Sequence, residues 1–505
     1  MYDSNFLLNQ LREATIECEA DTVAELDDGT VVSYSELFIN VEKIAAMLVK
    51  QGLLPGERVV VQVNKSIFAI ELYLGVILAG GIFIPLNTAY TVSELEYFLS
   101  DATPSILVCD PNNESQLKTV AQQAGVKQIL TLAQDGSGNL MGLADEESAG
   151  FSSVARSAYD LASIIYTSGT TGRSKGAMLS HENLSSNAKT LADYWKFEKN
   201  DKLIHSLPIF HVHGLFVAIN ITLLVGSSMI FHHKFEADVI LKDMSRATVL
   251  MGVPTFYVRL LELSDLNNKS TKNMRLFVSG SAPMLEDTHK QWEAKTDHAI
   301  IERYGMSETN MNTSNPYDGD RRAGTVGFPL PNVEVLVTEI STGKPLAIGE
   351  VGSIEVRGPN VFKGYWQMPE KTSEELRDSG FFITGDLGSF DEHGYLSIVG
   401  RSKDLVISGG YNIYPKELEL IIDEIDGVNE SAVIGLPDSD FGERVVAVIV
   451  KKVNAQINSQ DVIDYLQPKL ARFKQPKDIY FVDELPRNTM GKVQKNNLRQ
   501  TYQDT

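Results

Sequence analysis

The sequence is poor in cysteine and in positive charge, and each shortage excludes a class of function. Its 505 residues include two cysteines, Cys18 and Cys109, with no metal-like spacing, so both are expected to be small buried side chains in a reducing compartment. Asp and Glu number 66 against 45 Lys and Arg, a formal net charge of −21. This acidity argues against nucleic acid or an anionic membrane as a partner. An anionic substrate must therefore be bound by individual Lys and Arg side chains in a pocket.

The sequence also lacks a long apolar segment. The longest apolar run, residues 72–86, contains three glycines and is too short to span a bilayer. The first residues, MYDSNFLLNQLREA, have neither the basic region nor the long apolar region of an export signal. These features predict a cytoplasmic protein without membrane insertion, and they leave its oligomeric state open.

Strand and helix patterns alternate through the first 300 residues. Apolar runs at 57–63, 82–86 and 106–109 predict strands, and residues 67–79 predict a buried helix with Ser66 as its N-cap. Thr91 and Glu94 form a capping-box pattern that opens another helix. Strands separated by helices imply a parallel sheet that is covered on both faces.

The pattern changes beyond about residue 325, where short β-rich pieces with Gly and Pro suggest a small antiparallel unit. A compact α/β segment follows residues 400–404, and the tail after Lys492 is polar and expected to fray. The predicted fold is therefore α/β, with a large N-terminal domain over 1–400. That domain combines parallel-rich sheets sandwiched by helices with a small β-rich subdomain. A small mobile α+β C-terminal domain covers 401–505.

A loop rich in Gly, Ser and Thr lies in the segment IIYTSGTTGRSKGAMLS, residues 164–180. Glycines let backbone N–H groups turn inward around a polyphosphate, and Lys175 supplies a point charge for phosphate oxygens. The segment is not a Walker A loop, because two residues separate Gly172 from Lys175 and Gly176 follows the lysine. A flexible surface loop of the same composition is the alternative.

Three later strands each end in a polar loop that contains glycine. Residues 203–207 lead into PIFHVHG, 276–278 lead into SGSAP, and 298–302 lead into RYGMSET. In open α/β sheets, ligands bind beyond the carboxyl ends of the strands. We therefore expect these loops to share one crevice.

Six motifs together resemble the adenylate-forming acyl-CoA synthetases, in order and over essentially the whole chain. They are YTSGTTGRSKG, GSAP, ERYGMSET, FFITGD, GRSKDLVISGGYNIYPKELE and PRNTMGK. The resemblance implies a two-step reaction that uses ATP, Mg²⁺ and coenzyme A. A carboxylate first attacks the α-phosphate of ATP, giving an acyl-adenylate and pyrophosphate, and the thiol of coenzyme A then displaces AMP.

The resemblance also implies roles for the motif residues. Lys492 would contact the α-phosphate and the substrate carboxylate, Glu308 would bind Mg²⁺, and Asp386 would accept the ribose hydroxyls. Lys492, His211 and Glu308 are the implied catalytic residues. The implied ATP- and AMP-binding residues are Thr167, Ser168, Gly169, Thr170, Thr171, Gly172, Lys175, Gly280, Ser281, Ala282, Glu302, Tyr304, Gly305, Met306, Ser307, Asp386 and Arg401.

Lys403 occupies the family's hinge position. Rotation of the small domain about this residue would exchange the face carrying Lys492 for the face carrying Gly409 and Gly410, which would line the entry of the thiol of coenzyme A. An ordinary loop turn is the alternative for the two glycines.

Several segments closely resemble those of malonyl-CoA synthetases, among them LPIFHVHGLF, VLMGVPTFYVRLLE and ERYGMSETNMNTSNPYDGDRRAGTVG. A dicarboxylate needs a cation for its distal carboxylate, and Arg259 and Arg303 are the candidates because guanidinium binds carboxylate bidentately. Either arginine could instead form a surface ion pair. His211 and Met306 would border a short acyl chain, and His213 either joins them or only packs.

The expected activity is the ligation of malonate to coenzyme A through malonyl-adenylate. The alternatives are ligation of another short acid, such as methylmalonate or a short- or medium-chain monocarboxylate, and a stand-alone adenylation protein that charges a carrier protein. A non-catalytic nucleotide-binding module is disfavoured, because Lys175, Glu308, Asp386 and Lys492 are all present.

Overall fold

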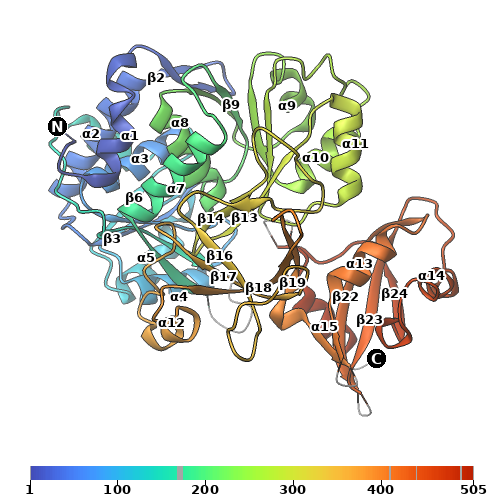
Figure 1. Cartoon of the computed structure of the whole chain (residues 1–505). Coiled ribbons are helices and arrows are strands. Elements are labelled where there is room, and N and C mark those ends of the chain that lie inside the picture. The colour runs from blue at the N-terminus through green and yellow to red at the C-terminus, as the bar shows by residue number, and fades with distance from the viewer. Residues whose placement is uncertain (1, 168–173, 409–410, 439–440, 489–491, 504–505) are drawn as a thin grey trace.

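The computed structural model describes residues 2–167, 174–408, 411–438, 441–488 and 492–503 (Figure 1). One sheet of its N-terminal part has six strands in the order β6-β5-β3-β4-β7-β8. All neighbours in it are parallel except β7 and β8, which pair antiparallel on either side of the Gly-rich loop. The strands are β3 (Arg58–Gln62), β4 (Ile82–Pro85), β5 (Ile106–Cys109), β6 (Gln128–Thr131), β7 (Leu161–Thr167) and β8 (Lys175–Ser180).

The second sheet has nine strands in the order β15-β14-β13-β12-β11-β9-β10-β1-β2. Its central strands are parallel, so the chain segments that follow β9, β11, β12 and β13 emerge at one edge. The strands are β1 (Thr22–Leu26), β2 (Val31–Ser33), β9 (Lys202–His205), β10 (Ser228–Phe231), β11 (Val249–Gly252), β12 (Leu276–Ser279), β13 (Ile301–Met306), β14 (Asn310–Ser314) and β15 (Phe328–Pro329).

Local sequence signals set the helix starts. The Ser66 hydroxyl accepts the Ala69 N–H at 3.2 Å and caps α3, and Thr91 forms a capping box with Glu94 at the start of α4, both as predicted. The helices of this part are α1 (Phe6–Glu13), α2 (Tyr34–Lys50), α3 (Ile67–Leu78), α4 (Val92–Ala102), α5 (Glu114–Gln123), α6 (Asn139–Asp145), α7 (His181–Tyr194), the π-helix η3 (His213–Ile219), α8 (Asn220–Val225), α9 (Ala237–Asp243), α10 (Pro254–Leu261) and α11 (Glu286–Thr296).

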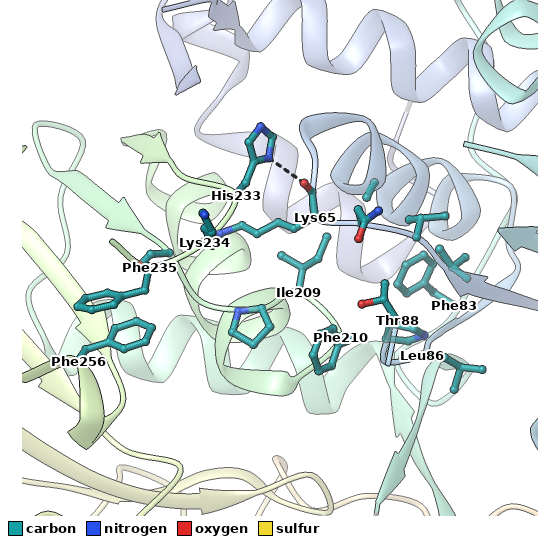
Figure 2. A pocket seen from close by; sticks show the side chains of 17 residues that line it. Lys65, Phe83, Leu86, Thr88, Ile209, Phe210, His233, Lys234, Phe235 and Phe256 are labelled. Atoms are coloured by element: carbon teal, nitrogen blue, oxygen red, sulfur yellow. Dashed lines mark hydrogen bonds between the residues drawn. The ribbon is translucent and has the colours of Figure 1, made fainter. Parts of the chain in front are cut away.

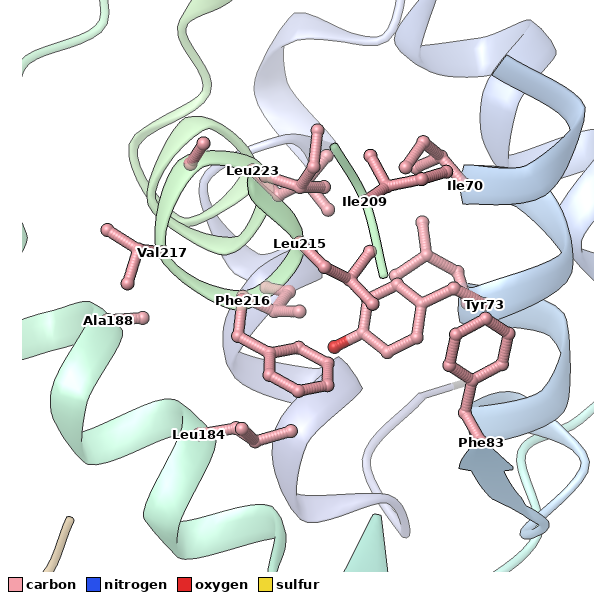
Figure 3. Close-up of a cluster of buried hydrophobic side chains, with 14 of the residues drawn as sticks. Ile70, Tyr73, Phe83, Leu184, Ala188, Ile209, Leu215, Phe216, Val217 and Leu223 are labelled. Atoms are coloured by element: carbon pink, nitrogen blue, oxygen red, sulfur yellow. The ribbon is translucent and has the colours of Figure 1, made fainter. Parts of the chain in front are cut away.

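The largest hydrophobic core joins the two sheets through the helices between them (Figure 3). Tyr73 of α3 contacts Phe83 of β4 and Phe216 of η3, with ring centroids 5.2 and 5.7 Å apart. The buried Tyr73 hydroxyl donates to Asn220 Oδ1 at 3.2 Å, so its polar atom is satisfied. This packing fixes the strand ends of one sheet relative to those of the other.

A four-stranded antiparallel sheet and a small C-terminal unit complete the fold (orange to red in Figure 1). The four-stranded sheet contains β16 (Glu334–Thr338), β17 (Gly352–Arg357), β18 (Phe382–Phe390) and β19 (Leu396–Arg401), with α12 (Pro369–Glu375) between β17 and β18. The C-terminal unit contains β20 (Val406–Ser408), β21 (Tyr411–Ile413), α13 (Pro415–Asp423), β22 (Val428–Asp438), β23 (Gly442–Lys451), α14 (Ser459–Leu466), β24 (Asp478–Val482) and α15 (Lys495–Tyr502).

This arrangement confirms the predicted fold class, and it corrects one detail. The tail that we expected to fray forms α15, because Leu498 is buried and Lys495 and Arg499 pair with Glu419 and Asp404 at 2.5 and 2.7 Å. The predicted boundary after residue 400 falls inside β19 and remains a prediction. Among the residues that the structure describes, no helix is both long enough and apolar enough to cross a membrane.

Candidate active site

Arg303 of β13 lies against the turn that follows β12. A Cβ atom on Gly280 would come within 2.5 Å of Arg303 Nε, so glycine makes room for the guanidinium. Ser281 has φ +71°, a left-handed conformation that is uncommon for a side-chain-bearing residue. Its hydroxyl lies 3.4 Å from Arg303 Nη2. The turn after β12 therefore leaves space for the side chain of Arg303.

Arg303 is a buried cation without an ion-pair partner among the described residues. It is 3% exposed, burial lowers its pKa to about 9, and its Nε has no hydrogen-bond partner in the described part of the chain. None of the ion pairs among the described residues includes it. A buried unpaired cation costs folding free energy, so the arrangement favours an anion beside Arg303.

Two histidines lie close to this arginine. His213 at the start of η3 places Nδ1 3.4 Å from the Ser281 hydroxyl. Burial, followed by the charge of Arg303, holds the His213 pKa well below its usual value. Burial, followed by Lys492, lowers the His211 pKa to about 3. Both imidazoles are thus neutral at neutral pH, and the Nε2 atom of each is buried without a described hydrogen-bond partner.

Asp386 of β18 is held by two donors. The Tyr304 hydroxyl donates to Asp386 Oδ2 at 2.6 Å, and Arg401 Nε lies 2.6 Å from Oδ1. Lys492 comes from the C-terminal unit. Its side chain remains accessible to solvent, but the surrounding protein lowers its pKa through desolvation, followed by the charge of Arg401, while Asp386 and Glu308 oppose that change. Lys492 of the C-terminal unit is therefore close enough to Arg401 and Asp386 for their charges to influence its pKa.

A chain of contacts links Lys175 to Glu308. Lys175 Nζ lies 3.1 and 3.2 Å from the two carboxylate oxygens of Glu375, and 4.0 Å from the centre of the Tyr365 ring. The Tyr365 hydroxyl lies 2.6 Å from Glu375 Oε2 and 3.0 Å from Glu308 Oε1. Burial raises the pKa of Glu308, which is 4% exposed. Sequence reasoning missed both Tyr365 and Glu375, since neither stands in a motif that indicates phosphate chemistry.

Two predicted site residues do not reach the cleft. Arg259 lies on the exposed face of α10, whereas Tyr257 and Leu260 of the same helix are buried. The Glu302 side chain instead lies 2.9 Å from His289 Nδ1 of α11, and its carbonyl oxygen accepts the Asn315 N–H at 3.0 Å. In this structure the Arg259 side chain is at the surface and the Glu302 side chain is in the core, and both assignments stay predictions.

The remaining predicted residues lie around the cleft or outside the described residues. Ala282, Met306 and Ser307 are half-buried beside the residues above, and the Thr167 hydroxyl donates to the Lys175 carbonyl oxygen at 3.4 Å. A Cβ on Gly305 would lie 2.8 Å from Met311 Cα, so glycine allows the tight β13–β14 hairpin. The predictions for Ser168, Gly169, Thr170, Thr171, Gly172, Gly409 and Gly410 concern residues that the structure does not describe.

Lys403 lies in the short 3₁₀ helix η4 (Ser402–Asp404) and is exposed. The residues on either side of this turn are attached to different parts of the molecule. Arg401 pairs with Asp386 in the four-stranded sheet, and Asp404 pairs with Arg499 of α15 at 2.7 Å. This attachment is compatible with the predicted hinge, which stays a prediction.

A separate cavity of about 320 Å³ adjoins the loop that leads to His211 (Figure 2). Ile209 and Phe210 line one side, and Phe235 and Phe256 stack with ring centroids 3.9 Å apart at one end. Lys234 also lines the cavity, and its side chain is 78% exposed. The cavity is thus mostly apolar, with a cation that remains in contact with solvent.

The chain is similar over nearly its whole length to proteins of known name. ATP-bound MatB from Rhodopseudomonas palustris superposes with a TM-score of 0.97 and 56% identity, over 100% of this chain and 99% of that chain. A malonate–CoA ligase of Arabidopsis thaliana is 32% identical over 97% of this chain and 88% of its own length. A long-chain-fatty-acid–CoA ligase of Bacillus subtilis is also 32% identical, over 95% of this chain and 92% of its own length.

Family matches cover both parts of the chain. The AMP-binding enzyme family matches residues 12–366, and the AMP-binding enzyme C-terminal domain matches residues 417–492. The first match includes Lys175, Arg303 and Glu308, and the second ends at Lys492. The chain is therefore a member of the AMP-binding enzyme family.

Proposed function

We propose that the chain ligates malonate to coenzyme A through a malonyl-adenylate, releasing pyrophosphate and then AMP. The observation that carries this proposal is Arg303, a buried guanidinium without a carboxylate partner among the described residues. The two curated relatives described above act on different acids at the same 32% identity, so identity alone does not choose between them. The unpaired charge favours the dicarboxylate.

Arg303 would hold the distal carboxylate of malonate bidentately, since all five guanidinium donors point in fixed directions. The neutral imidazoles of His211 and His213 add no negative charge beside it and leave Nε2 atoms available to a ligand. A monocarboxylate of similar length would leave Arg303 unpaired, at the cost of its buried charge. Methylmalonate keeps both carboxylates and therefore stays a candidate substrate.

Lys492 would act where the two anions meet. Attack of a carboxylate on the α-phosphate brings negative charges together, and a cation between them stabilises the transition state. The charges of Asp386, Glu308 and Arg303 all influence the pKa of Lys492, which supports a place for this side chain between the nucleotide end and the acyl end. Asp386, oriented by Tyr304 and Arg401, would accept the ribose hydroxyls.

Glu308 is the residue that fits Mg²⁺. Burial raises the pKa of its carboxylate, and the charge of Lys175 offsets only part of that change. A divalent cation beside Glu308 would offset the rest of the burial cost. The described residues hold no group of three or more possible protein ligands, which fits a magnesium ion bound by one carboxylate and by phosphate oxygens. When bound, the ion would neutralise charge on the phosphates.

The cavity beside Ile209 and Phe210 would accommodate part of the second substrate. The pantetheine arm of coenzyme A is uncharged and its nucleotide end is anionic, which matches an apolar cavity with Lys234 at its wall. For the thiol step, rotation about Lys403 would withdraw Lys492 from the cleft. The proposal places the enzyme in the cytoplasm, supported by two cysteines that are both free and buried.

The test is a panel of acids, assayed for AMP release that depends on coenzyme A. Malonate should give the highest kcat/KM, methylmalonate should follow, and butyrate should be poor. Replacing coenzyme A with a carrier protein in the same assay tests the alternative of a stand-alone adenylation protein. A preference for butyrate, or turnover only with the carrier protein, would overturn the proposal.

A further inference from the structure

The cation expected to bind phosphate already has a carboxylate partner. Lys175 Nζ contacts both oxygens of Glu375, at 3.1 and 3.2 Å, and the two side chains are 18% and 23% exposed. An ammonium group has three donors, so this contact occupies two of them. The phosphates of a nucleotide and the carboxylate of Glu375 would therefore compete for the ammonium group of Lys175.

Glu375 has a second cation within reach. Lys371, one turn earlier on α12, places Nζ 3.0 Å from Glu375 Oε1 and 2.7 Å from Glu374. Glu375 thus lies between Lys175 of the six-stranded sheet and Lys371 of its own helix. If Lys175 turns to a phosphate, Lys371 still neutralises Glu375.

The surroundings favour such an exchange. α12 buries none of its seven residues, so no core packing fixes the position of Glu375 at its end. Burial acts to raise the pKa of Glu375, but hydrogen bonds from Tyr365, Lys371 and Lys175 together lower it, so the group is an anion. The Tyr365 hydroxyl also links Glu375 to Glu308, at 2.6 and 3.0 Å.

We propose that Glu375 is a resident counter-ion of Lys175 that competes with the phosphates of ATP and pyrophosphate and passes to Lys371 when they bind. This inference rests on the proposed function only in taking Lys175 as a phosphate-binding residue. Glu375 weakens nucleotide binding in the ground state, because its charge repels the phosphates and must leave Lys175. After adenylate formation, the return of Glu375 to Lys175 promotes release of pyrophosphate.

The experiment compares MgATP binding to the full-length wild-type enzyme and to Glu375→Gln, by titration calorimetry without acid or coenzyme A. Removal of one partly screened charge should lower the Kd for MgATP roughly tenfold. The inhibition constant of pyrophosphate in the ligation assay should fall by a similar factor. Unchanged or weaker MgATP binding by Glu375→Gln would overturn the proposal.

Two further variants keep the test independent of folding defects. Lys371→Met removes the second partner, so Glu375 should hold Lys175 more tightly and raise the Kd for MgATP about threefold. Glu374→Gln makes the same charge change at a 64% exposed neighbour that contacts Lys371 alone, and should change the Kd less than about twofold. A general structural effect would change the Kd for MgATP in the same direction in all three variants, which would contradict the proposal.

A failure of the proposed function gives a different result. In that case the wild-type enzyme would bind MgATP without malonate-dependent release of pyrophosphate, and the competition at Lys175 would still be measurable. Wild-type protein that bound neither MgATP nor pyrophosphate would overturn the assignment of Lys175, and the counter-ion role of Glu375 with it.

Discussion

The two ends of the cleft satisfy their cations in different ways. At the acyl end, Arg303 is buried beside neutral histidines and has no carboxylate partner in the described structure. At the phosphate end, Lys175 contacts both oxygens of Glu375. Both ends bind anions in our proposal, but only one of them is neutralised by the protein.

The difference indicates two requirements of the reaction. A buried cation without a partner binds a ligand that carries a matching anionic group. A ligand without that group leaves the cation unpaired and binds less well, which gives specificity. A cation that already has a partner binds its ligand by exchange, which suits a site that must release pyrophosphate in each turnover. Variants that alter one end should therefore change acid selectivity, and variants at the other should change phosphate affinity.

The largest effect is expected at Lys492, which our proposal places between the two ends. Lys492→Ala should slow malonate-dependent ATP–pyrophosphate exchange by about 100- to 1000-fold, through loss of transition-state charge stabilisation. Thioester formation from supplied malonyl-adenylate should continue. Equal losses in both half-reactions would show that the substitution damages the structure and that Lys492 has no specific role in adenylate formation.

A smaller and unequal effect is expected from Lys403→Pro. Proline fixes φ near the value of a 3₁₀ turn, so it should favour the arrangement seen here, with Lys492 in the cleft. Adenylate formation should stay within about twofold of wild type, while thioester formation falls roughly tenfold. If single-turnover measurements of both steps match the wild type, Lys403 is not the hinge.

Gly280→Ala should affect the acyl end and spare the phosphate end at Lys175. The added Cβ would lie 2.5 Å from Arg303 Nε and displace the guanidinium, while the strand ends keep their backbone. A displacement of this size should lower kcat/KM for malonate by roughly 10- to 100-fold. The inhibition constant of pyrophosphate, which tests the phosphate end at Lys175, serves as the control and should not change. A matching loss of pyrophosphate affinity would remove the distinction between the two ends.

The smallest effect is expected from Arg259→Met. Arg259 is exposed on α10, and surface substitutions of this kind change free energies by about 0.5 kcal/mol or less. Malonate kcat/KM and the melting temperature should both stay close to the wild-type values. Selective loss of malonate activity would show that Arg259 binds malonate, contrary to its exposed position on α10.

Sequence motifs predicted site residues that the structure places in or directly after strands. Arg303 lies within β13, Glu308 follows β13 and Asp386 lies within β18, and the charges of all three influence the pKa of Lys492. The position of the Glu302 side chain follows from strand geometry. Neighbouring residues of a strand face opposite sides, so Glu302 faces α11 while Arg303 faces away from it.

Helical periodicity argues against Arg259 in the same way. Tyr257 and Leu260 occupy the buried face of α10, which leaves Arg259 on the outer face. The contact between Lys175 and Glu375 could not be predicted, because 200 residues separate them and α12 carries several acidic side chains. The helix α15 was also missed, since its polar composition conceals Leu498 and the ion pairs that hold it.

The central claim is that Arg303 receives the distal carboxylate, and one ratio tests it directly. Removal of a buried charged partner should cost about 2–5 kcal/mol for malonate, whereas butyrate never makes that contact. The ratio of kcat/KM for malonate to that for butyrate should therefore collapse in Arg303→Met, with butyrate turnover unchanged or higher. Equal loss of both activities in Arg303→Met, or a wild-type enzyme that prefers butyrate, would contradict the claim.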